Sequence, residues 1–275
     1  MHSRSCRLVL ASLLALFGIQ TGFARTDQSS GHSPGQHADL DRHDSESRDD
    51  DKDHRQQFTI LQTTDLHDHA NGADHVGLDV DPVNGTSVTG AYARIAAYVN
   101  HVRATAGHPV IVVDSGDWTM GTLYDLTLGD RPLALFFFDA LRYNCVTLGN
   151  HDFDYSPKGL ARILDAAQTS FGFRTPIVAS NMDLHGDPSL APFVGRHKTI
   201  ETTRTEELED GLRVGYIGLM GHAAAGAAGA SAPVTFTDPA ADYAGIQRLV
   251  DSLRRRGADI VIALSHSGTD ASGTK

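Results

Sequence analysis

The sequence predicts an α/β fold, because short apolar runs alternate along the chain with longer stretches of helical periodicity. The runs are rich in Val and Ile, which is typical of parallel strands that are buried on both faces. Four runs are each followed closely by polar residues: Phe58–Leu61, Val110–Val113, Cys145–Leu148 and Ile260–Leu264. We therefore expect these four runs to form buried parallel strands of one domain.

Four segments between the runs are predicted to be helices. The apolar residues of Ala91–Ala106 recur at helical spacing, and Gly107 ends that segment. Pro132–Leu141 is strongly apolar, and Ser156-Pro157 opens the next helix, since proline is tolerated in a first turn. Tyr243–Arg256 is amphipathic, with a basic last turn and a glycine after it, and it leads into the last apolar run.

The remaining segments are predicted to be strands and connections. Ile177–Ser180 is a further strand, and Val194–Thr203 and Arg213–Leu219 are expected to pair as a hairpin around Glu206–Gly211. Gly221–Ala232 is almost entirely Gly and Ala, so it is either a flexible loop near the strand ends or a plain connector. We favour the connector, because a poorly specified backbone seldom positions chemistry.

Residues 1–24 are predicted to be a secretory signal peptide that is cleaved, because two arginines precede an apolar stretch and small residues follow it. A membrane anchor is the alternative, but the stretch from Leu8 to Ile19 is short for a spanning helix, which needs ~20 residues. Residues 25–57 are rich in Asp, His and Ser and hold only two apolar side chains, so we expect a disordered linker. A weak metal-gathering tail is the alternative, but no ligand spacing repeats there.

The chain is acidic, with a formal net charge of −11 over 275 residues. Removal of residues 1–24 takes away two basic groups and no acidic ones, so the mature charge is 21 minus 34, or −13. This charge argues against nucleic-acid binding, which needs Lys and Arg to neutralise phosphates. Only Cys145 remains in the mature chain, so no intramolecular disulfide can form, and its place in a predicted strand indicates a buried apolar role.

Polar side chains follow all four apolar runs. The segments are Asp65-Leu66-His67, Gly116-Asp117, Gly149-Asn150-His151-Asp152 and Ser265-His266. Ligands of open α/β sheets bind beyond the carboxyl ends of the strands, so two carboxylates, one amide and two imidazoles would converge at one edge. Carboxylate oxygens suit hard cations and imidazole favours transition metals, so the sequence predicts a metal site there.

These segments resemble the calcineurin-like metallophosphoesterases, and within them the secreted 5′-nucleotidase and UDP-sugar hydrolase branch. The similarity runs from about Thr59 to Asp270, and its most specific part is Gly149-Asn150-His151-Asp152-Phe153-Asp154. The resemblance implies a sandwich of two β-sheets flanked by helices, formed by residues 58–275 and incomplete at the C-terminus. It also implies a metallophosphoesterase that holds two divalent metal ions, of which Zn, Mn, Mg, Fe and Co are the candidates.

The resemblance assigns a role to each site residue. Asp117 is expected to bridge the two metals, with Asp65 and His67 on one metal and Asn150 and His266 on the other. Two divalent cations clamp the oxygens of a phosphate ester and lower the pKa of bound water towards ~7.

A second unit consists of His151 and Asp154, which the resemblance marks as catalytic. Asp154 is expected to hold His151, which stabilises the developing phosphoryl charge or protonates the leaving oxygen. Hydrogen bonding around the ligands is the most that we expect of Asp68, Asp114 and Asp152. Trp118 either walls the pocket or packs in the core, and the sequence does not separate the two.

Two parts of the family pattern are missing: a Gly-His-X-His element after the Ser-His strand and a C-terminal domain that clamps the base. Because the chain ends at Lys275, we expect an N-terminal fragment that is inactive or weakly active. The expected parent activity is phosphomonoester hydrolysis of extracytoplasmic nucleotides, as in 5′-nucleotidases of nucleotide catabolism. The alternatives are a UDP-sugar hydrolase, a 2′,3′-cyclic phosphodiesterase or a non-catalytic metal-binding fragment. The expected partner is a nucleotide or another phosphate ester, and the expected location is secreted or periplasmic, without a stable membrane anchor.

Overall fold

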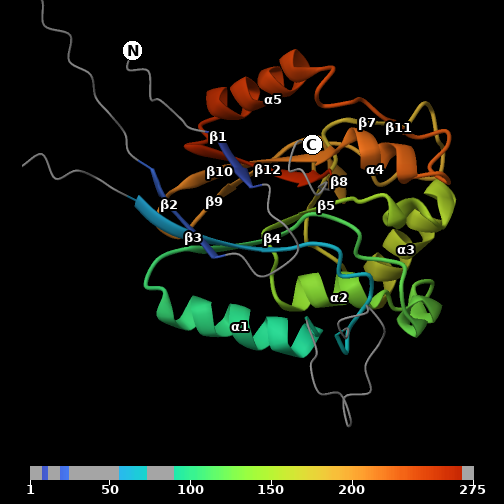
Figure 1. The fold of residues 1–275 in the computed structure, drawn as a ribbon, viewed down its shortest axis with the longest axis horizontal. Helices are drawn as coiled ribbons and strands as arrows, with labels where there is room; N and C mark the ends of the chain where they lie inside the picture. Colours follow the sequence, from blue (N-terminus) through green and yellow to red (C-terminus); the bar gives the residue numbers. More distant parts are fainter. Residues whose placement is uncertain (1–7, 12–18, 25–55, 73–89, 268–275) are drawn as a thin grey trace, which may run out of the picture.

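Residues 8–11, 19–24, 56–72 and 90–267 are described by the structure, a computed structural model. They form two main β-sheets that pack face to face, with helices against the outer face of each (Figure 1). The predicted α/β fold is confirmed, and so is the two-sheet sandwich that the family resemblance implies.

The first sheet has six strands in the order β2-β3-β4-β5-β6-β8. These strands are β2 (Ile19–Ala24), β3 (Gln56–Thr63), β4 (Val110–Asp114), β5 (Cys145–Thr147), β6 (Ile177–Val178) and β8 (Ile200–Glu201). Strands β3, β4, β5, β6 and β8 of this sheet run parallel, and only β2 is antiparallel to its neighbour. Because Thr63 pairs with Asp114 at the ends of β3 and β4, the loops after these strands leave the same edge of the sheet.

The second sheet has four strands in the order β1-β12-β10-β9. These strands are β1 (Leu8–Ala11), β12 (Ile260–His266), β10 (Arg213–Met220) and β9 (Arg204–Glu207). Strands β10 and β12 are parallel and in register up to the pair of Met220 and His266. A small third sheet joins β7 (Met182–Asp183) to β11 (Thr235–Phe236).

Burial on both faces explains why the strand runs are continuously apolar. In β4, Ile111 and Val113 face the other sheet, whereas Val112 faces the helices. In β12, Ile262 lies between the sheets and Val261 packs outward, and all five of these side chains are essentially inaccessible to solvent. Successive side chains of a strand point to opposite faces, so each sheet buries one set of residues against the other sheet and one against helices.

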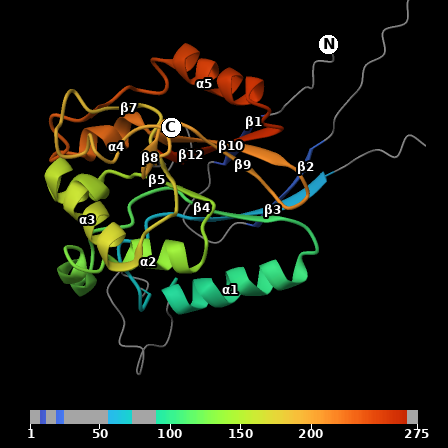
Figure 2. The same ribbon diagram turned by 180° about the vertical axis from the view of Figure 1, so that it is seen from behind.

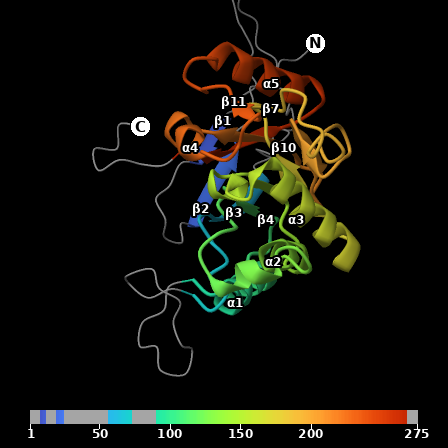
Figure 3. The ribbon, with the colours of Figure 1, turned by 90° about the vertical axis from the view of Figure 1, so that its right-hand side faces the viewer.

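Helices cover the two outer faces. They are α1 (Tyr92–Thr105), α2 (Leu133–Ala140), α3 (Ser156–Phe171), α4 (His222–Ala227) and α5 (Tyr243–Arg255), with short 3₁₀ turns η1 (Leu123–Thr127) and η2 (His151–Phe153). Helices α1, α2 and α3 pack on the six-stranded sheet, whereas α5 packs on the four-stranded sheet (Figures 2 and 3). The four predicted helices are confirmed. No helix in the described part of the chain is long and apolar enough to cross a membrane.

The hairpin prediction is correct in its second strand and wrong in its first. The turn between Glu207 and Arg213 joins β9 to β10, which are antiparallel. However, Ile200 and Glu201 form β8 and pair in parallel with β6 of the other sheet. The predicted run Val194–Thr203 therefore ends the first sheet, and the chain crosses between sheets before the hairpin begins. Alternating side chains indicate a strand but cannot show which sheet it joins.

The Gly- and Ala-rich segment Gly221–Ala232 contains helix α4, which neither of the two alternatives anticipated. It begins next to the strand ends, because Gly221 N donates to His266 O at 2.8 Å. Ala224 and Ala228 are buried, so the small side chains let the helix lie close to the core.

The strands β1 and β2 fall within residues 1–24, the segment predicted to be cleaved. Strand β1 pairs with β12 and β2 pairs with β3, each at an outer edge of its sheet. The signal peptide stays a prediction. Most of the predicted linker, residues 25–55, lies outside the described residues, and β3 begins at Gln56, two residues before the predicted domain start.

Candidate metal centre

The loops after β3 and β4 run side by side and hold the first predicted ligands. Asp65 N donates to Gly116 O, and His67 N donates to Asp117 O, both at 3.0 Å. Asp65, His67 and Asp117 have φ angles of 52°, 46° and 58°, in the left-handed region that non-glycine residues rarely adopt. Such backbone conformations persist where surrounding contacts hold them, and they are concentrated at functional sites.

One oxygen of the Asp117 carboxylate accepts a backbone hydrogen bond, and the other oxygen faces two histidine rings. His151 N donates to Asp117 Oδ1 at 2.8 Å. Asp117 Oδ2 lies 3.1 Å from His266 Nε2 and 3.8 Å from His67 Nε2. The backbone of Gly149, in the loop after β5, lies so close to Asp117 that a side chain at position 149 would have no room. Asp117 is 3% exposed, so its charge is shielded from solvent.

Backbone carbonyls orient both imidazole rings. His266 Nδ1–H donates to Ser115 O at 2.9 Å, and His67 Nδ1–H donates to Met120 O at 2.7 Å. Because a carbonyl only accepts, Nδ1 of each ring carries a hydrogen, and Nε2 of each ring faces the carboxylates. Histidine ligands of metals are commonly held in this way.

The donor set fits a divalent cation. One ligand atom each from Asp65, Asp117 and His266 lies within 4.8 Å of the others. Asn150 Oδ1 is 3.2 Å from His266 Nε2, and His67 Nε2 is 3.9 Å from Asp65 Oδ1. The structure therefore brings all five predicted ligands together, from four strand ends and both sheets.

Electrostatics at this point favour a positive charge. Burial alone would lower the pKa of His266, but its hydrogen bond to Asp117 and the charges of Asp117 and Asp65 raise that pKa to about 9. Burial would raise the pKa of Asp117, but the hydrogen bond and charge of His266 lower it below its usual range. A cation bound here would take the place of the proton on His266, since ligand binding by imidazole requires the neutral ring.

His151 and Asp154 form the predicted pair beside this cluster. His151 Nδ1–H donates to Asp154 Oδ2 at 2.8 Å, and each side chain is one-third exposed. The His151 ring meets the His67 ring edge to face, with centroids 5.2 Å apart. Burial lowers the pKa of His151, but the bond to Asp154 and the charge of Asp117 raise it overall. Since Asp154 occupies Nδ1, proton exchange with a substrate would use Nε2.

Asp152 joins the β4 and β5 loops beneath the site. Its Oδ2 accepts from Gly149 N at 2.7 Å and from Asp117 N at 3.1 Å, and its Oδ1 accepts from Trp118 N and Thr119 N at 3.1 Å. Four backbone donors on one fully buried carboxylate fix the loop that carries Asp117. Burial, together with the charge of Asp117, raises the pKa of Asp152 to about 7.

Two further predicted neighbours are also buried. Asp114 accepts from Gly116 N at 2.8 Å and from the Thr63 hydroxyl at 2.7 Å. Asp68 accepts from the Tyr92 hydroxyl at 3.3 Å. The hydrogen bonding expected of the aspartates around the site is therefore present. Trp118 was expected either to wall the pocket or to pack in the core. It is fully buried in the hydrophobic core, so its role is packing.

The carbonyls of Ser115 and Met120 are the parts of the site that sequence reasoning missed. Both belong to the chain around Asp117, but a backbone acceptor leaves no trace in side-chain identity. Met120 has a positive φ of 66°, and its carbonyl accepts from His67. Methionine is not a residue type from which a positive φ could be predicted.

Comparison with known proteins points to one family. The pattern of the family described as Calcineurin-like phosphoesterase matches residues 58–273. A bovine 5′-nucleotidase is 28% identical over 214 residues, which is 77% of this chain and 34% of that protein. A snake venom 5′-nucleotidase of Gloydius brevicauda is 26% identical over 214 residues, 77% of this chain and 33% of that protein. The solved structure of a Thermus thermophilus 5′-nucleotidase precursor superposes with a TM-score of 0.58 at 30% identity, covering 76% of this chain and 37% of that one. The chain thus spans about a third of the length of these relatives.

Proposed function

Because the chain belongs to the calcineurin-like phosphoesterase family across residues 58–273, we propose that it contributes the metal-binding site of a 5′-nucleotidase-like hydrolase. The proposed reaction releases phosphate from nucleoside monophosphates outside the cytoplasm. Relatives described as 5′-nucleotidase, one of them from a venom, support both the substrate class and the location. UDP-sugars and 2′,3′-cyclic nucleotides are the alternative substrates.

The proposed ligand set comprises Asp117 between two divalent cations, Asp65 and His67 on one side, and Asn150 and His266 on the other. Its support is the convergence of three charged or imidazole donors within 4.8 Å, with Asn150 Oδ1 and His67 Nε2 adjacent. When bound, two divalent cations would neutralise phosphate oxygens and lower the pKa of an attacking water towards ~7. The neutral amide of Asn150 adds a ligand without placing a third negative charge beside the two carboxylates.

His151 is proposed to donate a hydrogen bond or a proton to the phosphate ester at Nε2. Asp154 keeps the ring oriented through Nδ1 and favours its protonated form. The pair lies beside the cluster, because His151 N holds Asp117 and its ring contacts His67. A protein that only stores metal has no use for such a pair. The presence of the His151–Asp154 hydrogen bond next to the donor cluster is the observation that carries the proposal.

The test is a phosphate-release assay on the purified chain with AMP, UDP-glucose and 2′,3′-cyclic AMP, with Mn²⁺ or Zn²⁺ and with a chelator. We expect slow release from AMP that requires metal, in keeping with the weak activity expected from the sequence. Asp117→Ala is expected to lower the content of both metals, because a bridging carboxylate serves both.

Arg162→Gln, on helix α3 and outside the site, is the control for a general effect of substitution. Two metals retained in Asp117→Ala would overturn the bridging role. Metal binding without release from any substrate would leave a metal-binding protein and refute the hydrolase. Release from UDP-glucose or the cyclic nucleotide in preference to AMP would replace the proposed substrate class.

A further inference from the structure

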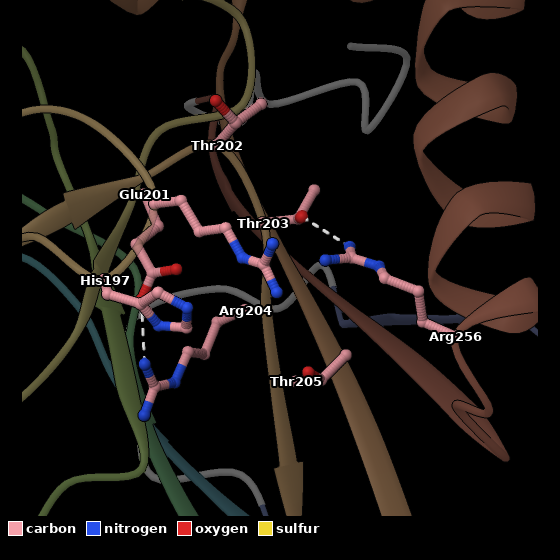
Figure 4. Close-up of a pocket in the computed structure, with 8 residues that line it drawn as sticks. His197, Glu201, Thr202, Thr203, Arg204, Thr205 and Arg256 are labelled. Carbon is pink, nitrogen blue, oxygen red and sulfur yellow. Dashed lines mark hydrogen bonds and ion pairs between the residues drawn. The ribbon is translucent and has the colours of Figure 1, made fainter.

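A hollow of about 390 Å³ lies at the edge of the sandwich where β8 ends the first sheet and β9 ends the second. The turn before β8 contributes Arg196 and His197, and the crossing into β9 contributes Glu201 to Thr205. Arg256, at the end of α5, lines the hollow from the other side (Figure 4). None of these residues belongs to the metal centre, so the hollow is a separate feature of the fold.

The hollow is lined by three arginines but by only one carboxylate. Arg204 Nη1 donates to Glu201 Oε1 at 2.8 Å, so this pair is close to neutral (Figure 4). Arg256 Nη2 donates to the neutral Thr203 hydroxyl at 2.7 Å. Within the described residues, no carboxylate lies within ion-pair distance of Arg196 or Arg256. Two guanidinium groups that line the hollow thus have no ion-pair partner in the described part of a chain whose net charge is −11.

The donors of the hollow suit phosphate oxygens. Guanidinium groups present planar forks of N–H donors that match phosphate and carboxylate geometry. Thr202, Thr203 and Thr205 also line the hollow, and their side chains carry neutral hydroxyl groups. The volume falls in the range of small-molecule sites, ~300–1,000 Å³, and exceeds what one inorganic phosphate fills. The hollow therefore has room for a phosphate group and for an organic part attached to it.

Arginine at the end of a helix also offsets the helix dipole, which would explain Arg256 without any ligand. That explanation applies equally to Arg255, which occupies the last turn of α5 but does not line the hollow. It does not apply to Arg196, which lies in a turn before a strand. The two arginines from separate elements facing one hollow favour a ligand.

We infer that this hollow is a second anion site, which binds a phosphate-bearing small molecule through Arg196 and Arg256 and is independent of the metal centre. The ligand is either inorganic phosphate or a phosphate monoester, because both present the same dianionic group. The inference does not depend on the hydrolytic activity proposed above.

Calorimetric titration of the full chain tests it, with inorganic phosphate in one arm and AMP in the other. Chelator is present throughout, so that neither probe binds or reacts at a metal. We expect both probes to bind in the millimolar range or tighter, and binding to weaken as salt screens the arginines. Tighter binding of AMP would identify a monoester as the ligand, and equal binding would identify phosphate alone.

The variants are Arg196→Gln, Arg256→Gln and their combination, with Arg255→Gln as the matched control of equal charge change. Each of the first two is expected to weaken phosphate binding about tenfold or more, since hydrogen bonds to charged groups are among the stronger ones. Arg255→Gln is expected to stay within about twofold of wild type. Circular dichroism checks that all variants fold.

Amide NMR shifts locate the bound phosphate. We expect the amides of Thr202, Thr203 and Thr205 to move during the titration and those of Gly149 and Asn150 to stay in place. No binding up to about 10 mM phosphate, equal weakening in Arg255→Gln, or shifts confined to the metal centre would each overturn the inference.

Discussion

The substitution Gly149→Ala should damage the metal centre without replacing any proposed ligand. Gly149 lies in the loop after β5, and its backbone packs against Asp117 in the loop after β4. A Cβ at this position would lie 2.1 Å from Asp117 Oδ1 and 2.4 Å from Asp117 N. Favourable non-bonded contacts begin at ~3.5 Å between heavy atoms, so both distances are roughly 1 Å or more too short.

The size of the effect follows from what must move. The nitrogen of Asp117 is a backbone atom, so the clash cannot be relieved by a side-chain rotation, and the two loops must separate by about 1 Å. Overpacking of a well-packed site costs about 1–3 kcal/mol of unfolding free energy. The displaced carboxylate also loses its alignment with His266 Nε2, and we expect affinity for Mn²⁺ or Zn²⁺ to fall about 10–100-fold.

The assay combines metal titration with denaturant unfolding, and Gly226→Ala is the matched control. Gly226 lies in α4, a Cβ there would meet no atom within 4 Å, and its φ is ordinary. Alanine at that helical position should be neutral or stabilising by about 0.5–1 kcal/mol. If Gly149→Ala bound metal and unfolded like Gly226→Ala, the close approach of Gly149 to Asp117 would have no role in the site.

Three further outcomes are expected. His151→Ala should lower kcat for phosphate release about 10²–10⁴-fold with bound metal unchanged, measured by steady-state kinetics and elemental analysis, and a rate within about twofold of wild type would contradict its role. Asp152→Asn should lower the unfolding free energy by about 1–3 kcal/mol in urea titrations, because the amide group turns hydrogens towards backbone N–H donors, and a change below about 0.5 kcal/mol would contradict it. Burial raises the pKa of Asp114 well above its usual range, so the folded state binds its proton more tightly than the unfolded state. The unfolding free energy of the wild type must then fall as pH rises from the unfolded pKa of Asp114, near ~3.9, towards its folded pKa. Asp114→Asn lacks this proton, so its stability relative to the wild type should increase with pH over that window. A stability difference between variant and wild type that does not change with pH would contradict this prediction.

The strands and helices could be predicted from the sequence because their signals are local. The runs Val110–Val113 and Ile260–Leu264 are continuously apolar since both faces of each strand are covered. The bounds of β4 and β12 agree closely with these two runs. Helix α1 ends at Thr105, two residues before Gly107, whose φ of 68° suits glycine. The hairpin failed at its first strand for the opposite reason, since the alternation of Val194–Thr203 is the same whichever sheet the strand joins.

The sequence by itself determined which residues stand at the ends of buried strands, and therefore which residue types were available for a metal. Tertiary structure decided how these residues meet. His266 arrives from the second sheet, more than one hundred residues after Asp117, and its Nε2 lies 3.1 Å from the Asp117 carboxylate. Backbone groups then orient the side chains: Ser115 O holds His266, and His151 N holds Asp117. Every residue carries the same backbone donor and acceptor, so residue identities cannot reveal such contacts, and only the folded path of the chain creates them.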